Sequence, residues 1–118
     1  MASLEQMAAA ALSGEALALR SLAQDFLRGH PRLVDCQCPA SDDPHILAVS
    51  AALVELFAER TGQAGPAWAQ NIGPVPEPCF LVRSAATMKN LRRLCERESP
   101  WPLRRRNLFA PADFLRFA

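Results

Sequence analysis

The residues whose types best fit binding chemistry lie in the segment SPWPLRRRNLF, where Arg104, Arg105 and Arg106 follow Trp101. Each arginine offers a planar fork of donors that matches carboxylate and phosphate oxygens. Successive side chains on a helix point about 100° apart, so at most two of the three can share one target. The competing interpretation is a solvated corner, in which one arginine caps carbonyls of the preceding helix or pairs with an acid of the N-terminal half.

Charge is distributed unevenly along the chain, although the formal net charge is only +1. Residues 1–82 carry four arginines against nine acids, which gives −5, and residues 83–118 carry nine basic residues against three acids, which gives +6. A basic C-terminal third indicates a negatively charged partner or pairing between the two halves. The pI of about 7.7 is low for a dedicated nucleic-acid-binding domain, which typically exceeds about 9.

These observations predict a non-enzymatic interaction module that binds an acidic protein partner through a basic corner. The residues assigned to the corner are Arg92, Arg93, Trp101, Arg104, Arg105 and Arg106. Tryptophan and arginine are enriched at the energetic centres of protein interfaces. Nucleic-acid binding through the same arginines is the alternative hypothesis, and it requires an affinity that falls steeply with salt.

Signals for catalysis or metal binding are weak. The sequence has no tyrosine, no glycine-rich phosphate loop and no G-x-S-x-G motif. A zinc site could be drawn from His30, Cys36, Cys38 and His45, but the C-Q-C spacing is tighter than the two to four residues usual between paired cysteines. We therefore expect no metal, no cofactor and no enzymatic activity. An enzyme would need a pocket near Cys36, Cys38 or His45.

The length of 118 residues and an apolar content of 50% predict one domain, residues 1–118, with a single core. The N-terminal segment lacks the cationic start and apolar core of a signal peptide, and no apolar run is long enough to span a membrane. We expect a cytoplasmic protein with no membrane partner, whose four cysteines are reduced thiols.

The first helix is predicted from about Leu4 to Leu27. Ser3 and Gln6 form a capping box before it, and an apolar stripe with helical spacing follows. Gly14 is the point at which this helix can break, since glycine costs about 1 kcal/mol relative to alanine in a helix interior.

A second helix is predicted between Asp43, which can cap it ahead of Pro44, and a stop at Gly62. Apolar residues cover most of its circumference, and Glu55 and Glu59 form its solvated strip. It is therefore either the buried central helix or a helix with one face against a partner chain, such as a second copy in a homodimer.

A proline- and glycine-rich connection, residues 63–82, follows this helix. We expect it to contain a short helix that starts at Pro66 and carries Trp68, and one short extended segment at Cys79–Val82. A third helix is predicted over Ser84–Glu98. The side chains expected on its inward face are Met88, Leu91, Leu94 and Cys95.

The C-terminal part should begin with a helical turn at Ser99 and Pro100 and close it with Asn107 in the left-handed conformation. Trp101, with Leu108 and Phe109 running extended, should anchor the turn to the core. A last turn is expected from Pro111, with apolar side chains Phe114, Leu115 and Phe117. The predicted fold class is all-α: a single domain of four or five helices with a long Pro/Gly-rich connection and at most one short extended segment.

Two segments carry recognisable patterns. PHILAVSAALVELFAERTGQAGPAWA, Pro44–Ala69, contains an A-A-L-x-E helix, an R-x-G stop and a P-x-W turn, and ESPWPLRRRNLFAPADFLRFA, Glu98–Ala118, contains E-S-P, R-R-R-N and L-F elements. These resemble small bacterial helical domains found alone or behind a helix-turn-helix domain, some beside nucleotidyltransferase-like partners in toxin–antitoxin pairs. The resemblance implies a helical accessory or antitoxin-like protein and supplies no active-site residues. The N-terminal helix matches no DNA-reading helix-turn-helix, which argues against direct operator binding.

Overall fold

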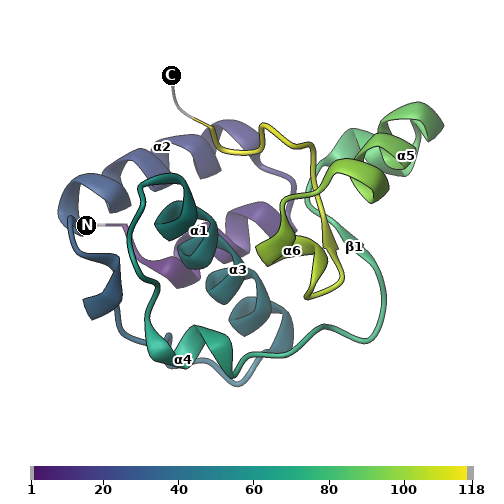
Figure 1. Ribbon diagram of the computed structural model, residues 1–118. Helices are drawn as coiled ribbons and strands as arrows, with labels where there is room; N and C mark the ends of the chain where they lie inside the picture. The colour runs from purple at the N-terminus through teal and green to yellow at the C-terminus, as the bar shows by residue number, and fades with distance from the viewer. Residues whose placement is uncertain (1, 117–118) are drawn as a thin grey trace.

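A computed structural model describes residues 2–116, and in it the N-terminal segment forms two helices (Figure 1). Helix α1 spans Leu4–Leu12 and begins with the expected capping box at Ser3. Helix α2 spans Ala16–Gly29. The chain turns between them at Gly14, whose φ of 70° lies in the left-handed region that glycine adopts without strain. The single helix of the sequence prediction is therefore two helices, divided at the expected glycine.

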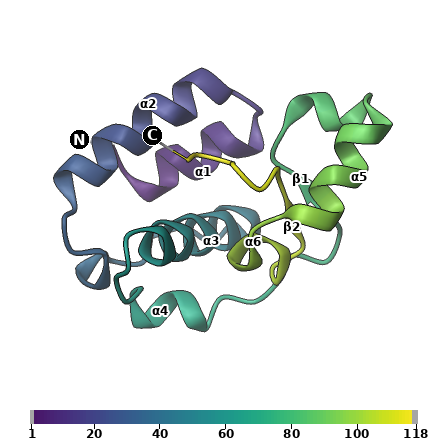
Figure 2. The same cartoon turned by 45° about the horizontal axis from the view of Figure 1, so that its top comes forward.

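Helix α3, Pro44–Arg60, is the centre of the fold. Asp43 caps its first turn through the side-chain oxygen, and Gly62 follows its end with a φ of 68°. Helices α1, α4 (Ala67–Gln70) and α6 (Trp101–Arg104) pack against it, as Figures 1 and 2 show. Its buried residues are Ala48, Val49, Ser50, Ala51, Ala52, Leu53, Val54, Leu56, Phe57 and Ala58. The chain's own elements cover the apolar face of α3, so a homodimer is not needed to bury it.

The connection after α3 packs against the rest of the molecule through α4. Pro66 precedes α4, as predicted, and Trp68 within α4 donates its indole N–H to the carbonyl of Cys36 at 2.7 Å. Cys36 directly follows a short 3-10 helix, η1, at Leu33–Asp35, which packs against α3. The proline-rich connection is thus packed through α4 against the loop that leads into α3.

Two short strands, β1 (Cys79–Phe80) and β2 (Leu108–Phe109), pair in parallel (Figure 2). Backbone amides of Cys79 and Leu81 donate to the carbonyls of Asn107 and Phe109, both at 2.9 Å. Asn107 has a φ of 65°, the left-handed conformation expected for it. Both segments run extended as predicted, and their parallel pairing is what the sequence did not indicate.

The third predicted helix starts later than expected. A 3-10 helix, η2, occupies Arg83–Ala86, and helix α5 spans Lys89–Glu98 with Met88 at its N-cap. Met88 therefore precedes the helical stripe and is 55% exposed, so its predicted inward orientation is wrong. Cys95 is buried as expected. Figure 2 shows α5 projecting from the body of the molecule.

The C-terminal segment returns to α3. The amide of Phe114 donates to the carbonyl of Pro111 at 3.0 Å, which forms the predicted last turn. Arg60 of α3 donates to the carbonyls of Ala112 and Phe114, which holds this turn in place. Phe117, the third apolar residue expected there, lies outside the described residues.

The mainly helical fold class is confirmed. Within residues 2–116 there are six α-helices and two 3-10 helices, more than the predicted four or five because the first helix divides in two. The radius of gyration is 13.1 Å, close to the roughly 13 Å of a compact domain of about 100 residues. None of the helices in this part of the chain combines the length and the apolar composition needed to cross a membrane.

Candidate functional site

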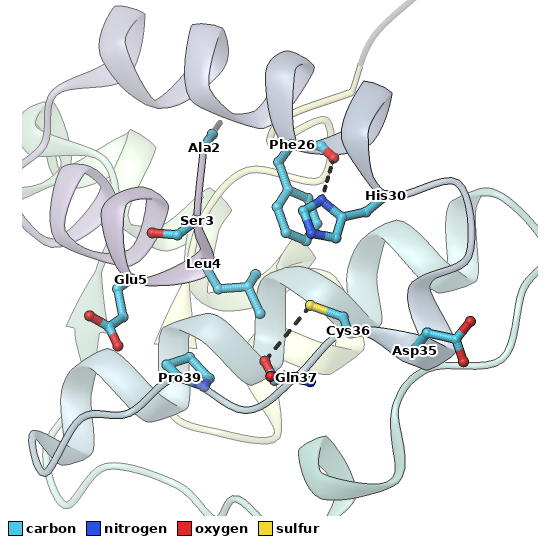
Figure 3. Close-up of a pocket in the computed structure, with 10 residues that line it drawn as sticks. All are labelled: Ala2, Ser3, Leu4, Glu5, Phe26, His30, Asp35, Cys36, Gln37 and Pro39. Carbon is cyan, nitrogen blue, oxygen red and sulfur yellow. Dashed lines mark hydrogen bonds between the residues drawn. The ribbon is translucent and has the colours of Figure 1, made fainter.

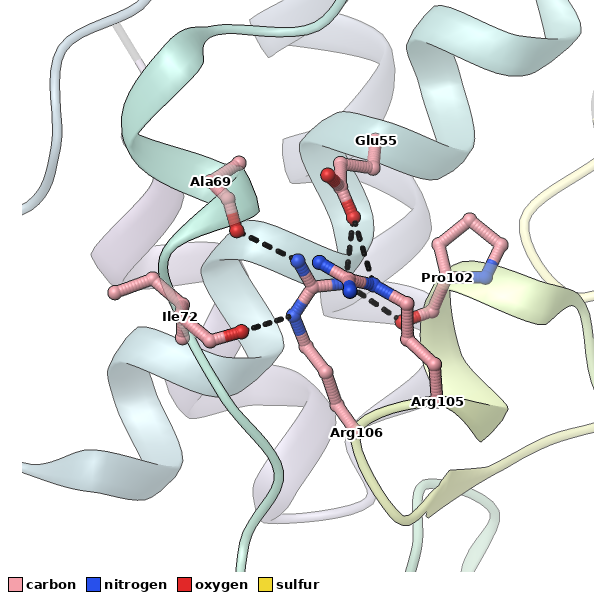
Figure 4. A network of polar contacts seen from close by, with 6 residues as sticks. All are labelled: Glu55, Ala69, Ile72, Pro102, Arg105 and Arg106. Atoms are coloured by element: carbon pink, nitrogen blue, oxygen red, sulfur yellow. Dashed lines mark hydrogen bonds and ion pairs between the residues drawn. The ribbon is translucent and has the colours of Figure 1, made fainter.

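The buried member of the arginine triplet is Arg106, whose side chain has no exposed surface. Figure 4 shows its guanidinium group at the centre of a network of polar contacts. Its Nε donates to the carbonyl of Ile72 at 3.1 Å, Nη1 to that of Pro102 at 2.8 Å and Nη2 to that of Ala69 at 2.7 Å. Nη1 also lies 2.6 Å from Oε1 of Glu55. All three guanidinium nitrogens are engaged inside the molecule, so the assignment of Arg106 to a partner-binding surface is wrong.

Glu55 is held between two arginines instead of lying in a solvated strip. Its side chain is 19% exposed, and Oε1 also lies 3.6 Å from Nε of Arg105. Burial lowers the pKa of Arg106, and the hydrogen bond and charge of Glu55 oppose that shift. The guanidinium stays charged because arginine does not lose its proton in proteins. Arg105, with a side chain 32% exposed, has its Nε turned toward Glu55.

The exposed arginines form a strip across the end of α5 and the start of the next turn. Arg93 and Arg97 stand one turn apart on α5, and Nη1 of Arg104 donates to the carbonyl of Arg97 at 3.4 Å. Arg97 forms a solvent-exposed ion pair with Glu98 at 3.5 Å. Arg93 and Arg104 have no ion pair with another residue among positions 2–116. We call Arg93, Arg97 and Arg104 the arginine strip. Its charge is largely uncompensated within the described chain.

Arg92 lies on a different side of α5 from the arginine strip. Its guanidinium carbon sits 4.9 Å from the ring centre of Phe80, and its Nε lies 3.5 Å from Oε1 of Glu96. The structure therefore does not gather all six residues assigned to the basic corner. It divides them into a buried centre, an exposed strip and a separate cation–aromatic contact.

Trp101 is 64% exposed, so it does not anchor the α6 turn to the core as expected. The fully buried Leu103 and Leu108 hold the turn there. Trp101 and Pro102 line a hollow of about 280 Å³ beside α3. An exposed tryptophan three residues before Arg104 shares its helical face, which places an aromatic surface next to the arginine strip.

The residues considered for zinc are separated in the structure. His30 and Cys36 both line an open hollow of about 600 Å³ (Figure 3), whereas Cys38 and His45 lie outside it. No group of three or more histidine, cysteine or acidic side chains is placed to hold a metal ion anywhere in the described part of the chain. Nδ1 of His30 donates to the carbonyl of Phe26 at 2.9 Å, and its ring stacks on the Phe26 ring. The imidazole is thereby held in one orientation by its own helix.

The hollow beside Cys36 provides the pocket that the enzymatic hypothesis requires, but the surroundings of the Cys36 thiol do not favour its reactive form. Burial raises the pKa of the Cys36 thiol. A nucleophilic cysteine requires the opposite shift, because the thiolate is the reactive form. The raised pKa therefore argues against an activated Cys36 thiolate at this place.

The four thiols should differ sharply in reactivity. Cys38 is exposed, whereas burial raises the pKa of Cys36, Cys79 and Cys95. With a chromogenic disulfide reagent at pH 7, we expect one thiol to react about tenfold faster or more than the other three, and Cys38→Ser to remove that phase. Equal rates for all four thiols in the folded protein would contradict the burial described here.

Sequence reasoning missed two features of the site. The pairing of Arg106 with Glu55 joins residues far apart in the chain, so no local pattern indicated it. The second missed feature is Arg83, which the sequence indicated only as one of the basic residues of the C-terminal third.

Comparison of the chain with protein-family models, with curated proteins and with solved structures finds no match.

Proposed function

We propose that the protein is a non-enzymatic interaction module that docks an acidic protein surface through the arginine strip, with Trp101 as its aromatic neighbour. The observation that carries the proposal is the contact between Nη1 of Arg104 and the carbonyl of Arg97, because it joins exposed cations of two helices into one surface. The same chemistry fits an antitoxin-like accessory protein, the kind of protein that the two sequence segments resemble.

The buried hydrogen bonds of Arg106 hold part of the arginine strip in place. Arg106 binds the carbonyls of the 69–72 segment and of Pro102, and so fixes the short helix that carries Trp101 and Arg104. A binding surface that is already ordered loses less conformational entropy on association than a mobile one. Trp101, a tryptophan that is 64% exposed, has the features of an interface anchor.

The proposal predicts that reversing two charges of the strip weakens partner binding. Arg93→Glu with Arg97→Glu should reduce affinity for the acidic partner by about tenfold or more, through lost complementarity and new repulsion. The matched control is Arg28→Glu with Arg32→Glu, which changes the net charge equally at side chains 77% and 76% exposed elsewhere. The thermal midpoints of both double variants should stay close to that of the parent.

The measurement begins with capture of the partner from nuclease-treated lysate. The captured protein is then titrated against the parent, the strip variant and the control variant. Equal affinity of the strip variant and the parent would refute the proposal. The alternative, nucleic-acid binding, predicts a different result: capture lost on nuclease treatment and an affinity for duplex or single strands that falls steeply with salt, because each phosphate contact releases counterions.

A further inference from the structure

Two adjoining open hollows lie beside the turn between α1 and α2, which faces the segment from β1 to η2 (Figure 2). They have volumes of about 420 and 520 Å³ and share Gly14, Val82 and Arg83 in their walls. The apolar side chains that line one or the other are Leu12, Leu17, Leu19, Phe80, Leu81, Phe114 and Leu115. We call the two hollows together the Arg83 groove.

Arg83 is held in a fixed position where the two hollows meet. Its Nη2 donates to the carbonyl of Ser13, the C-cap of α1, at 2.8 Å. Gly14 permits this approach: a Cβ there would lie 3.1 Å from Cβ of Arg83 and 3.2 Å from its Nε. Arg83 makes no ion pair with any residue among positions 2–116, so its positive charge stands in the groove without a carboxylate partner.

The other charged groups at the groove are mainly cationic as well. Arg92 lines the smaller hollow and is partly offset by Glu96, whereas Arg20 lines the larger hollow and is engaged in an interaction of its own. Among the described residues that line either hollow, Asp113 is the one acid. The groove thus combines apolar walls with the unpaired positive charge of Arg83, which complements a ligand that is both apolar and negatively charged.

The two adjoining hollows fit an extended chain segment. Both are partly open to solvent, so a segment can lie across them and place a side chain in each. Leu17 at the edge is 85% exposed, the most exposed of the large apolar residues in the described chain. An apolar side chain in that position gains burial when a further segment lies across it.

We propose that the Arg83 groove binds a segment of a partner protein in which an aspartate or glutamate stands between large apolar side chains. The carboxylate pairs with Arg83, and the flanking apolar side chains enter the two hollows against Leu17 and Phe80. This surface is separate from the arginine strip, and its occupancy does not depend on the function proposed for the strip.

The test is selection of displayed random dodecapeptides on the whole immobilised chain, followed by fluorescence anisotropy with the enriched peptides. We expect enrichment of sequences with an acid flanked by apolar residues. Arg83→Gln and, separately, Leu17→Asp should each weaken their binding by about tenfold or more. Arg93→Glu with Arg97→Glu should leave binding within about twofold of the parent.

Leu17→Asp keeps the test valid if Arg83→Gln disturbs the turn. Leu17 is exposed and stands in the first turn of α2, where an aspartate is favourable. Failure to enrich any peptide, or peptides that bind both groove variants as tightly as the parent, would overturn the proposal. So would binding lost only in the strip variant, which would instead support the acidic partner of the strip.

Discussion

Replacement of Arg106 by alanine is expected to destabilise the fold by about 3 to 5 kcal/mol, the range for removing one partner of a buried ion pair. The variant leaves the charge of Glu55, 19% exposed, without its closest partner. It also removes the guanidinium donor from the carbonyls of Ala69, Ile72 and Pro102, although the Ala69 carbonyl still accepts from the amide of Ile72 at 3.2 Å. The loss is large because one side chain satisfies four acceptors from three separate segments.

Urea unfolding followed by circular dichroism measures this effect. The matched control is Arg104→Ala, an exposed member of the same triplet, for which we expect a change within about 0.5 kcal/mol. Combining Arg106→Ala with Glu55→Ala should recover only part of the loss, since the carboxylate that lost its closest partner is gone but the hydrogen bonds from the guanidinium to the three carbonyls are still missing. Similar stability of Arg106→Ala and Arg104→Ala would show that Arg106 is not buried as described.

Asn107→Val should cost about 2 to 3 kcal/mol, for two separable reasons. The residue has a φ of 65°, and a β-branched side chain in the left-handed region adds about 1 to 2 kcal/mol of strain. The substitution also removes the hydrogen bond from Nδ2 to the carbonyl of Val75 at 3.2 Å, for which about 1 kcal/mol is typical. Both effects act where α6 passes into β2.

Asn107→Gly is the control that separates the two contributions. Glycine adopts a positive φ without strain but lacks the side-chain donor, so we expect a loss of about 1 kcal/mol from the missing hydrogen bond. The free energies of unfolding of the two variants, compared with the parent, give the strain as their difference. If valine and glycine cost the same, the left-handed conformation at this position is not present in solution.

The elements of the fold were predictable where the signal is local. Ser3 with Gln6, and Asp43 with Pro44, satisfy or remove backbone donors within the same turn, so the helix starts follow from the residues themselves. Gly14 similarly indicated a turn with a positive φ, because glycine has no side chain to strain that conformation. Boundaries failed where no such signal acts: the predicted cap Ser84 lies within the 3-10 helix η2, and α5 begins five residues later, at Lys89.

The candidate site was predictable only in its composition. The sequence indicated a basic, aromatic corner in which Trp101 could either anchor the turn to the core or face a partner, and it assigned Arg106 to the surface. The structure exposes Trp101 and buries Arg106. Adjacent residues of one turn differ in exposure according to what packs against each side, and for Arg106 the deciding partners are Glu55 and the carbonyl of Ala69, 37 positions away.

The amino-acid sequence by itself determined the helical class, the caps at Ser3 and Asp43, the glycine and asparagine turns and the excess of cations in the C-terminal third, because these follow from residue type and from neighbours within about one turn. Only the tertiary structure decided which arginine is buried with Glu55, which ones form the exposed strip, and that Arg83 meets Ser13 across 70 positions. The physical reason is that desolvation of a charge is tolerated only where partners converge. That convergence arises when distant segments pack.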